Sequence, residues 1–417
     1  MFSPGSKGWI AKYADMLRKG EIEVCIEKPK GIGKEHFTHL TFENSGIIFG
    51  FATQLLFATH LNTSKWTAEE KLKCLLFESH LFVFVCNGGD PKKDFDRFID
   101  ELLTFYIHHS SKSISRLFTF FLKESRDEKL ENILAKRTDI RRTLLDGAIW
   151  VNYLSNAFVY LDVILFREFL CTKESMGETN YEEFALDALT ALTLSAYSDG
   201  KLESQEKAMF DVFLASANLN DERKEYAQEK FKKGATLADI SNKSLQNWLF
   251  KRFLLDISAL TIYSSHEALP EEKDFLNEFC LHLHIPPKDL DETLVMVERF
   301  VLNHNHQISF LQNRNSYERL YGNVSRRWIK ILGRNKDKLA LELRQSKELV
   351  SLIKKSTSED LTKEEKEKVK TQFLDIVKSM PALAIFMLPG GALLLPIVLK
   401  IIPDLIPSAF RDNEIES

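Results

Sequence analysis

The order of apolar and charged positions divides the chain into a long series of helical segments and one charge-free run near its end. Apolar residues recur at helical spacing in residues 71–86 and again in 97–107, and the sequence NGGDP at 87–91 separates the two segments. From Pro381 to Leu399 no side chain is charged. At about 1.5 Å of rise per residue, this run is nearly long enough to cross the roughly 30 Å hydrocarbon core of a bilayer.

This pattern predicts an all-α protein. A chain of 417 residues is too long for one compact domain, so we expect several parts. They are a multi-helix N-terminal domain at 1–175, a helical domain at 180–305, a basic amphipathic helical connector at 307–357, and a C-terminal segment at 358–417 that contains the apolar run 381–403.

A pattern of helix, tight turn and helix occurs twice in the middle of the chain. In the first copy, Gly200 is expected to end one helix with a positive φ, and Ser204 to cap the next. About 66 residues later the pattern returns, and Ser265–Glu272 aligns with Asp199–Glu206. The sequence therefore predicts an internal pseudo-repeat.

The repeated turn resembles the two halves of the TerB-like helical fold of tellurite-resistance proteins. That resemblance implies carboxylates for a divalent cation at Asp199, Glu206 and Glu272, with Ser265 and His266 standing where the second half of the family has Asp-Gly. With a half-lost ligand set, the expectation is a weakly bound Ca²⁺ or Mg²⁺ and no other cofactor. The alternative is turn chemistry alone, in which the acidic side chains stabilise helix N-termini.

The connector is strongly basic. Residues 311–357 hold twelve Lys or Arg against four acidic residues, although the whole chain carries −4. The residues expected to form a polybasic surface are Arg326, Arg327, Lys330, Arg334, Lys336 and Lys338. Such an amphipathic segment suits anionic lipid, ribosomal RNA, or simply water, and DNA is not an expected partner.

The C-terminal segment opens with a predicted capping box at Thr362 and Glu365, and Pro381 ends or kinks the helix that follows. The apolar run after it is interrupted at Pro389, Gly390 and Gly391. Further prolines of the predicted membrane segment are Pro396 and Pro403. A kinked membrane span is favoured; a buried helical hairpin packed on the preceding helices and an interfacial or re-entrant arrangement are the alternatives.

This segment resembles the Letm family of mitochondrial inner-membrane proteins, which is linked to cation/proton exchange and to ribosome binding. The shared features are the lead-in LTKEEKEK, the approach VKSMP and the string LLLPIVLKIIPDLIPSAF at 393–410. Seven residues follow Phe410, whereas the family continues with a helical soluble part, so the resemblance implies membrane association more directly than ribosome binding. With the TerB-like middle, the chain resembles bacterial Letm-related proteins described as biofilm-associated.

Composition and motifs narrow the function classes. The five cysteines are widely spaced without a CxxC, which favours a reducing compartment over disulfides or zinc, and charges in the N-terminal stretch argue against a secretory signal. No GxSxG, HExxH or Walker sequence occurs, so an enzyme is not expected.

Together these features predict a non-enzymatic, membrane-associated helical protein of the bacterial inner membrane, with most of the chain in the cytoplasm. Its role would lie in envelope or surface processes such as biofilm formation, and in cation balance. The alternatives are a cation/proton antiporter component and a ribosome- or RNA-docking factor that uses the basic face at 311–357. A membrane with anionic lipid is the expected partner, and a ribosome and a second copy of the chain are further partners that the sequence allows.

Overall fold

The computed structural model describes residues 2–108, 124–139, 156–171, 181–265, 269–304 and 325–380, and single positions between 383 and 402. These residues form helices joined by turns and loops, and none of the described positions is in a strand. The all-α prediction is therefore confirmed for the described part of the chain. The chain divides into two compact units, one made of residues 1–26, 42–290 and 307–310 and the other of 27–41, 291–306 and 311–417.

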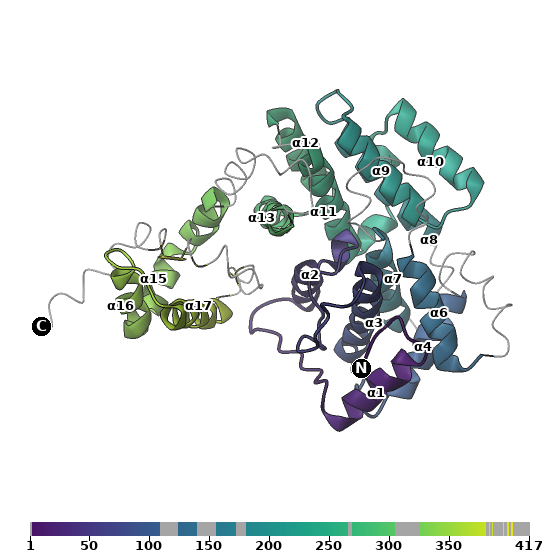
Figure 1. The fold of residues 1–417 in the computed structure, drawn as a ribbon. Coiled ribbons are helices and arrows are strands. Elements are labelled where there is room, and N and C mark those ends of the chain that lie inside the picture. Colours follow the sequence, from purple (N-terminus) through teal and green to yellow (C-terminus); the bar gives the residue numbers. More distant parts are fainter. Residues whose placement is uncertain are drawn as a thin grey trace, which may run out of the picture. The chain divides into compact units, whose positions relative to one another are not determined.

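The first unit contains the helices from α1 to α12 (Figure 1). Their bounds are α1 Trp9–Lys19, α3 Ala68–Cys86, α4 Phe95–His108, α6 Arg126–Thr138, α7 Val159–Cys171, α8 Tyr181–Ala196, α9 Ser204–Ser216, α10 Asp221–Lys233, α11 Trp248–Ser265 and α12 Pro270–His282, with short 3-10 turns at Ile47–Phe49, Leu237–Asp239 and Ser244–Gln246. Two further helices, α2 (Lys34–Ser45) and α13 (Pro287–Asn303), have residues in both units.

Helices α3 and α11 are the centres of the first unit. α3 packs against α4, α6 and α7, and α11 packs against α8, α9 and α12 (Figure 1). Both helices are apolar on nearly all sides, which is typical of helices surrounded by others. Because α7 also contacts α8 and α11, the two groups of helices are continuous. The proposed boundary between domains 1–175 and 180–305 stays a prediction about independent folding.

Buried ionic groups join elements that are distant in the sequence. The guanidinium of Arg137 and the carboxylate of Asp162 form two hydrogen bonds of 2.6 and 2.7 Å, and both side chains are almost fully buried. The hydroxyl groups of Tyr106 and Tyr181 lie 3.2 Å from this pair. Separating these groups would leave a buried charge without its partner, which is strongly unfavourable. Because Arg137 is on α6 and its neighbours are on α4, α7 and α8, the cluster fixes α6 against these three helices.

The second unit contains a small helical bundle. Residues 325–333 are helical, followed by α15 (Lys336–Gln345), α16 (Lys347–Lys355) and α17 (Lys363–Lys378), and α15, α16 and α17 lie side by side (Figure 1). The predicted capping box is confirmed, because Thr362 Oγ1 accepts from Glu365 N at 3.2 Å and Glu365 Oε2 accepts from Thr362 N at 2.9 Å. The apolar positions at helical spacing form the core: Trp328, Ile331, Leu332, Leu339, Leu343, Leu349, Val350, Ile353, Val369, Phe373, Ile376 and Val377.

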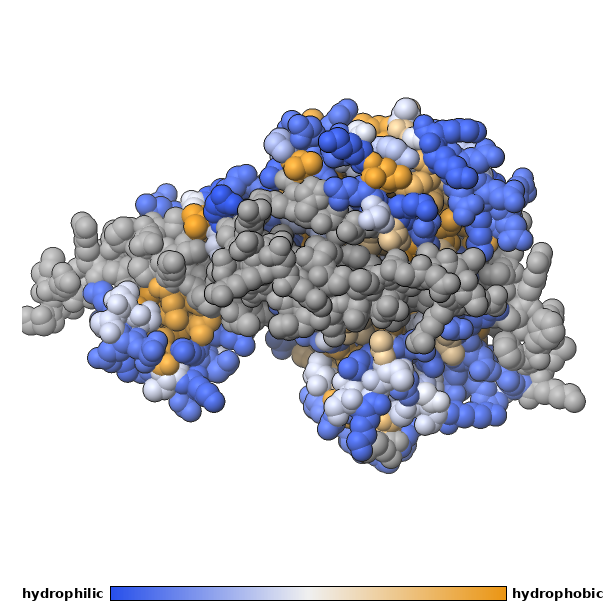
Figure 2. Space-filling view, turned by 45° about the horizontal axis from the view of Figure 1, so that its top comes forward, coloured by the Kyte–Doolittle hydropathy of each residue, from blue (hydrophilic) through white to orange (hydrophobic). Residues whose placement is uncertain are grey.

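The described surface is mainly hydrophilic in the view of Figure 2, where hydrophobic residues appear as separate patches. Among the described residues, no helix has both the length and the apolar character needed to cross a bilayer. Most of the predicted membrane segment, including Pro381, Pro389, Gly390, Gly391, Pro396 and Pro403, lies outside the described residues. The predicted span is therefore not tested by this finding.

Candidate functional site

The basic segment of the second unit faces the acidic side of α13. Asp291 of α13 lies 2.6 Å from Arg334 Nη2 and 3.0 Å from Lys330 Nζ. Two turns further along α13, the side chain of Glu298 is fully buried, and both of its carboxylate oxygens lie 3.2 Å from Arg327 Nε. The same α13 segment also binds α2, since His36 Nε2 lies 3.0 Å from Glu292. These ion pairs hold the 325–333 helix to α13.

This arrangement gives three residues of the predicted polybasic surface acidic partners within the protein. Of the six basic residues expected to act together, Arg327, Lys330 and Arg334 bind carboxylates within the protein, so their charges are largely neutralised there. Sequence reasoning missed the acidic partners Asp291 and Glu298. A signal existed, because these two residues are seven positions apart and so are Arg327 and Arg334, which places each pair on one helix face at matching intervals.

The paired Lys330 and Arg334 still have side chains that are 58% and 40% exposed. Lys336 and Lys338 are exposed, as is Arg326 on the preceding helix. Leu341 is 58% exposed on the same helix as these lysines. Some outer charges of α16 and α17 are paired within the protein: Lys368 binds Glu348 at 2.9 Å and Lys355 binds Glu365 at 2.7 Å. This unit therefore has exposed basic residues, of which Lys330 and Arg334 already have carboxylate partners.

Four described side chains of the apolar run are buried in the second unit, whereas Leu395 and Leu399 are half-buried. Leu383, Phe386, Val398 and Ile402 are at most 1% exposed. The ring of Phe386 packs edge-to-face on Trp328 with 4.5 Å between centroids, and it also contacts Phe373 of α17 at 6.2 Å. For these positions the contacts match the buried-hairpin alternative, in which the run packs on the preceding helices.

The two turns of the predicted pseudo-repeat have similar local contacts. Gly200 has the expected positive φ, +79°, but α8 ends at Ala196, so Gly200 closes the turn after the helix, and its N–H donates to Tyr197 O at 3.1 Å. Asp199 Oδ1 accepts from Lys201 N at 2.9 Å. Glu206 accepts from Glu203 N at 2.9 Å, and Glu272 accepts from Leu269 N in the same way at the start of α12. The expectation that Ser204 caps α9 is wrong by one position, because the cap residue is Glu203 and Ser204 is the first helical residue.

The structure brings two of the three predicted metal ligands into electrostatic range of each other. Glu206 and Glu272 are 2% and 1% exposed. The pKa of Glu206 is raised to about 7, mainly by burial and also by the negative charges of Glu272, Glu203 and Asp199. Within the described residues no group of three or more His, Cys, Asp or Glu is arranged to hold a metal ion. The observed contacts are those of the turn-chemistry alternative; the weak Ca²⁺ or Mg²⁺ site stays a prediction.

Comparison with known proteins places the family signal at the end of the chain. Residues 361–417 match the family model described as LETM1-like, RBD. No curated protein and no solved structure matches the chain. The LETM1-like region begins at Leu361, so it includes the capping box, α17 and the whole apolar run, and it confirms the Letm part of the resemblance. The TerB-like and biofilm-associated parts stay predictions.

Proposed function

We propose that this protein is a membrane-associated, Letm-related protein whose C-terminal helical unit docks on the ribosome. The observation that carries the proposal is the match of residues 361–417 to a LETM1-like ribosome-binding domain. The sequence alone favoured membrane association over ribosome binding for this region, whereas the matched family description supports ribosome binding.

The surface of the second unit supports an electrostatic part of this docking. Lys336 and Lys338 are exposed at the start of α15, and Lys363 is exposed in the first turn of α17. Exposed cations on short helices suit the phosphate backbone of ribosomal RNA, where each neutralised phosphate releases a counterion and makes binding dependent on salt. Arg327 and Lys330 on the 325–333 helix would contribute less to binding RNA, because they already pair with Glu298 and Asp291.

Co-sedimentation of the full-length protein with ribosomes at several salt concentrations tests the docking. The double variant Lys336→Glu/Lys338→Glu is expected to weaken binding at least tenfold at low salt and to flatten the salt dependence. The matched control is Lys232→Glu/Lys233→Glu, which reverses two exposed lysines at the end of α10 in the first unit. Equal losses in both variants, or no co-sedimentation of the unaltered protein, would overturn the proposal.

Membrane association is the second part of the proposal and rests on the charge-free run from Pro381 to Leu399 within the LETM1-like region. Carbonate extraction of cell membranes followed by blotting distinguishes a membrane span of this run from the buried hairpin. Retention of the full-length protein in the membrane pellet supports a span, whereas complete release supports the buried hairpin and removes the membrane claim.

The finer roles rest on family resemblance. A place at the bacterial inner membrane, a contribution to biofilm formation and an effect on cation balance are proposed on that basis, and no catalytic activity is assigned. Cation transport is the most directly testable of these roles. Flux in proteoliposomes that contain the purified protein, compared with empty vesicles, decides it, and equal flux in the two would end the antiporter alternative.

A further inference from the structure

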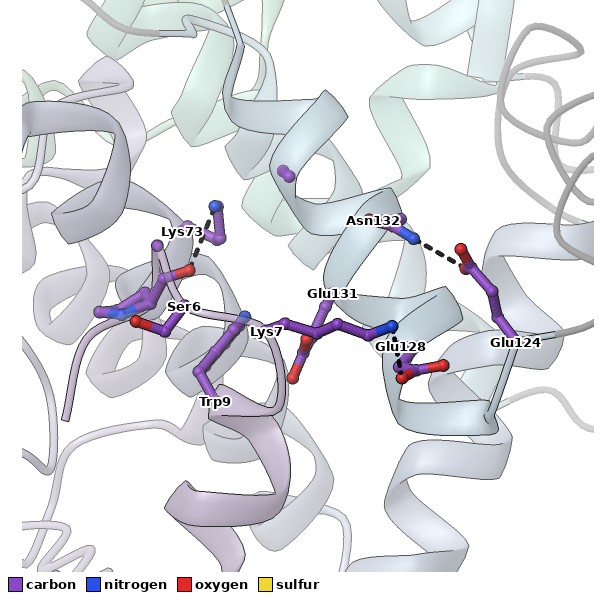
Figure 3. A pocket seen from close by; sticks show the side chains of 11 residues that line it. Ser6, Lys7, Trp9, Lys73, Glu124, Glu128, Glu131 and Asn132 are labelled. Carbon is purple, nitrogen blue, oxygen red and sulfur yellow. Dashed lines mark hydrogen bonds and ion pairs between the residues drawn. The ribbon is translucent and has the colours of Figure 1, made fainter.

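A cavity of about 280 Å³ lies in the first unit, between the N-terminal segment, α3 and α6 (Figure 3). Its charged lining consists of Lys7, Lys73, Glu124, Glu128 and Glu131. The volume is just below the roughly 300 Å³ at which pockets for drug-sized ligands begin, so the space suits a small metabolite.

One wall of the cavity is acidic. Glu128 and Glu131 stand on one face of α6, and Glu124 comes just before that helix. Glu131 accepts from Gly8 N and Ile10 N at 2.9 Å each, which ties the start of α1 to α6 and shapes the cavity. Glu128 binds Lys7 at 2.9 Å, but Lys7 is 76% exposed and is easily displaced. This wall therefore offers carboxylates to a cationic group.

The opposite side of the cavity offers donors. Trp9 is 2% exposed, and its Nε1 is buried without a hydrogen-bond partner among the described residues. Figure 3 shows the nitrogen of Trp9 turned toward the middle of the cavity. Lys73, on α3, makes one long contact of 3.3 Å to the carbonyl of Pro4, and burial lowers its pKa. Burying the Trp9 N–H without an acceptor, and the Lys73 ammonium without a carboxylate, is unfavourable. An anionic ligand that accepts from both groups would remove this penalty.

We propose that this cavity binds a free basic amino acid, lysine or arginine. The ligand carboxylate would accept from Trp9 Nε1 and Lys73 Nζ, while its α-ammonium and its side-chain cation face Glu124 and Glu128. The charge balance favours this class: the lining holds two cations and three carboxylates, so a ligand with one carboxylate and two positive groups neutralises it. The inference is independent of ribosome docking, because every residue of the cavity lies in the first unit.

Isothermal titration of the full-length protein with L-lysine tests the site. We expect saturable binding of one molecule per chain, with L-glutamate and cadaverine at least tenfold weaker, because glutamate reverses the side-chain charge and cadaverine lacks the carboxylate. Lys73→Met is expected to weaken L-lysine at least tenfold. Lys71→Met, on the same helix but outside the cavity, is the matched control and should bind as the unaltered protein does.

A second readout keeps the test decisive if Lys73→Met does not fold. L-lysine is expected to shift the indole N–H resonance of Trp9, assigned by its loss in Trp9→Phe, and Glu124→Gln should weaken binding while keeping the contact to Asn132. The proposal is overturned by the absence of saturable heat with L-lysine, by cadaverine binding as tightly, or by an unmoved Trp9 resonance at saturation.

Discussion

The guanidinium of Arg334 lies 2.6 Å from the carboxylate of Asp291, a residue 43 positions earlier in the chain. Asp291 also binds Lys330, so one carboxylate of α13 holds two cations of the segment that the sequence presented as a free basic face. The helices of the second unit are thus joined by ion pairs outside their apolar core, and part of the apparent positive surface is structural.

Replacing Asp291 by Asn is expected to lower the free energy of unfolding by about 1 kcal/mol. The effect is small because Lys330 and Arg334 are half-exposed, so solvent already screens their attraction to Asp291. Urea denaturation measures the change. Asp337→Asn, an exposed acidic residue on α15, serves as the control and should change little. A drop of equal size in both variants would show that Asp291 acts only through net charge.

The buried pair of Arg137 and Asp162 is expected to be far more sensitive. Asp162→Asn leaves a guanidinium without its counter-ion in the interior, and the loss of one partner of a buried pair typically costs about 3 to 5 kcal/mol. Asp96→Asn removes a partner of the exposed Arg126 and should cost within about 0.5 kcal/mol. Chemical denaturation of both variants checks the contrast, and similar midpoints would contradict it.

Local features of this fold could be predicted from the sequence. The capping box of Thr362 and Glu365 and the positive φ of Gly200 depend on residues within a few positions of each other, and both occur as expected. The cap of α9 was misplaced by one residue because Ser204 is a common capping residue, whereas the observed cap uses the side chain of Glu206 on the backbone of Glu203.

Long-range partners could not be predicted in the same way. Nothing local requires Arg334 to meet Asp291, and the burial of Glu298 depends on how α13 packs against the 325–333 helix. The cavity beside Trp9 joins segments more than 120 positions apart, as the bond from Gly8 N to Glu131 shows. A count of basic residues therefore could not show which of them have carboxylate partners, and the cavity residues form no recognisable sequence motif.

If the acidic residues of the two turns only stabilise helix N-termini, calcium is expected to leave the melting temperature unchanged. Asp199, Glu206 and Glu272 each accept from a backbone N–H of their own turn, so few of their oxygens are directed to a shared cation, while Ca²⁺ needs about six to eight. Differential scanning calorimetry with and without CaCl₂ checks this. A calcium-dependent rise that disappears in both Asp199→Ala and Glu206→Ala would instead establish the metal site.

Phe386 is expected to contribute to the core of the second unit. Its ring is 1% exposed and packs edge-to-face on Trp328, so Phe386→Ala should lower the free energy of unfolding by about 3 kcal/mol. Leu341→Ala, which truncates a 58% exposed side chain on α15, is the control and should cost less than about 0.5 kcal/mol. Urea unfolding followed by circular dichroism measures both; equal stability of the two variants would argue against a buried ring at position 386.

The stability of the first unit should fall as pH rises from 4.5 to 7. The unfolded carboxyl of Glu206 ionises near 4.5, whereas burial and the nearby charges raise its folded pKa to about 7, so in this window the folded state holds the extra proton. The free energy of unfolding is then expected to be about 3 kcal/mol lower above pH 7 than below pH 4.5. Glu206→Gln cannot ionise and should flatten this decline, while the exposed Glu348→Gln should retain it. Urea midpoints at several pH values distinguish the two, and parallel curves for Glu206→Gln and the unaltered protein would assign the decline to other groups.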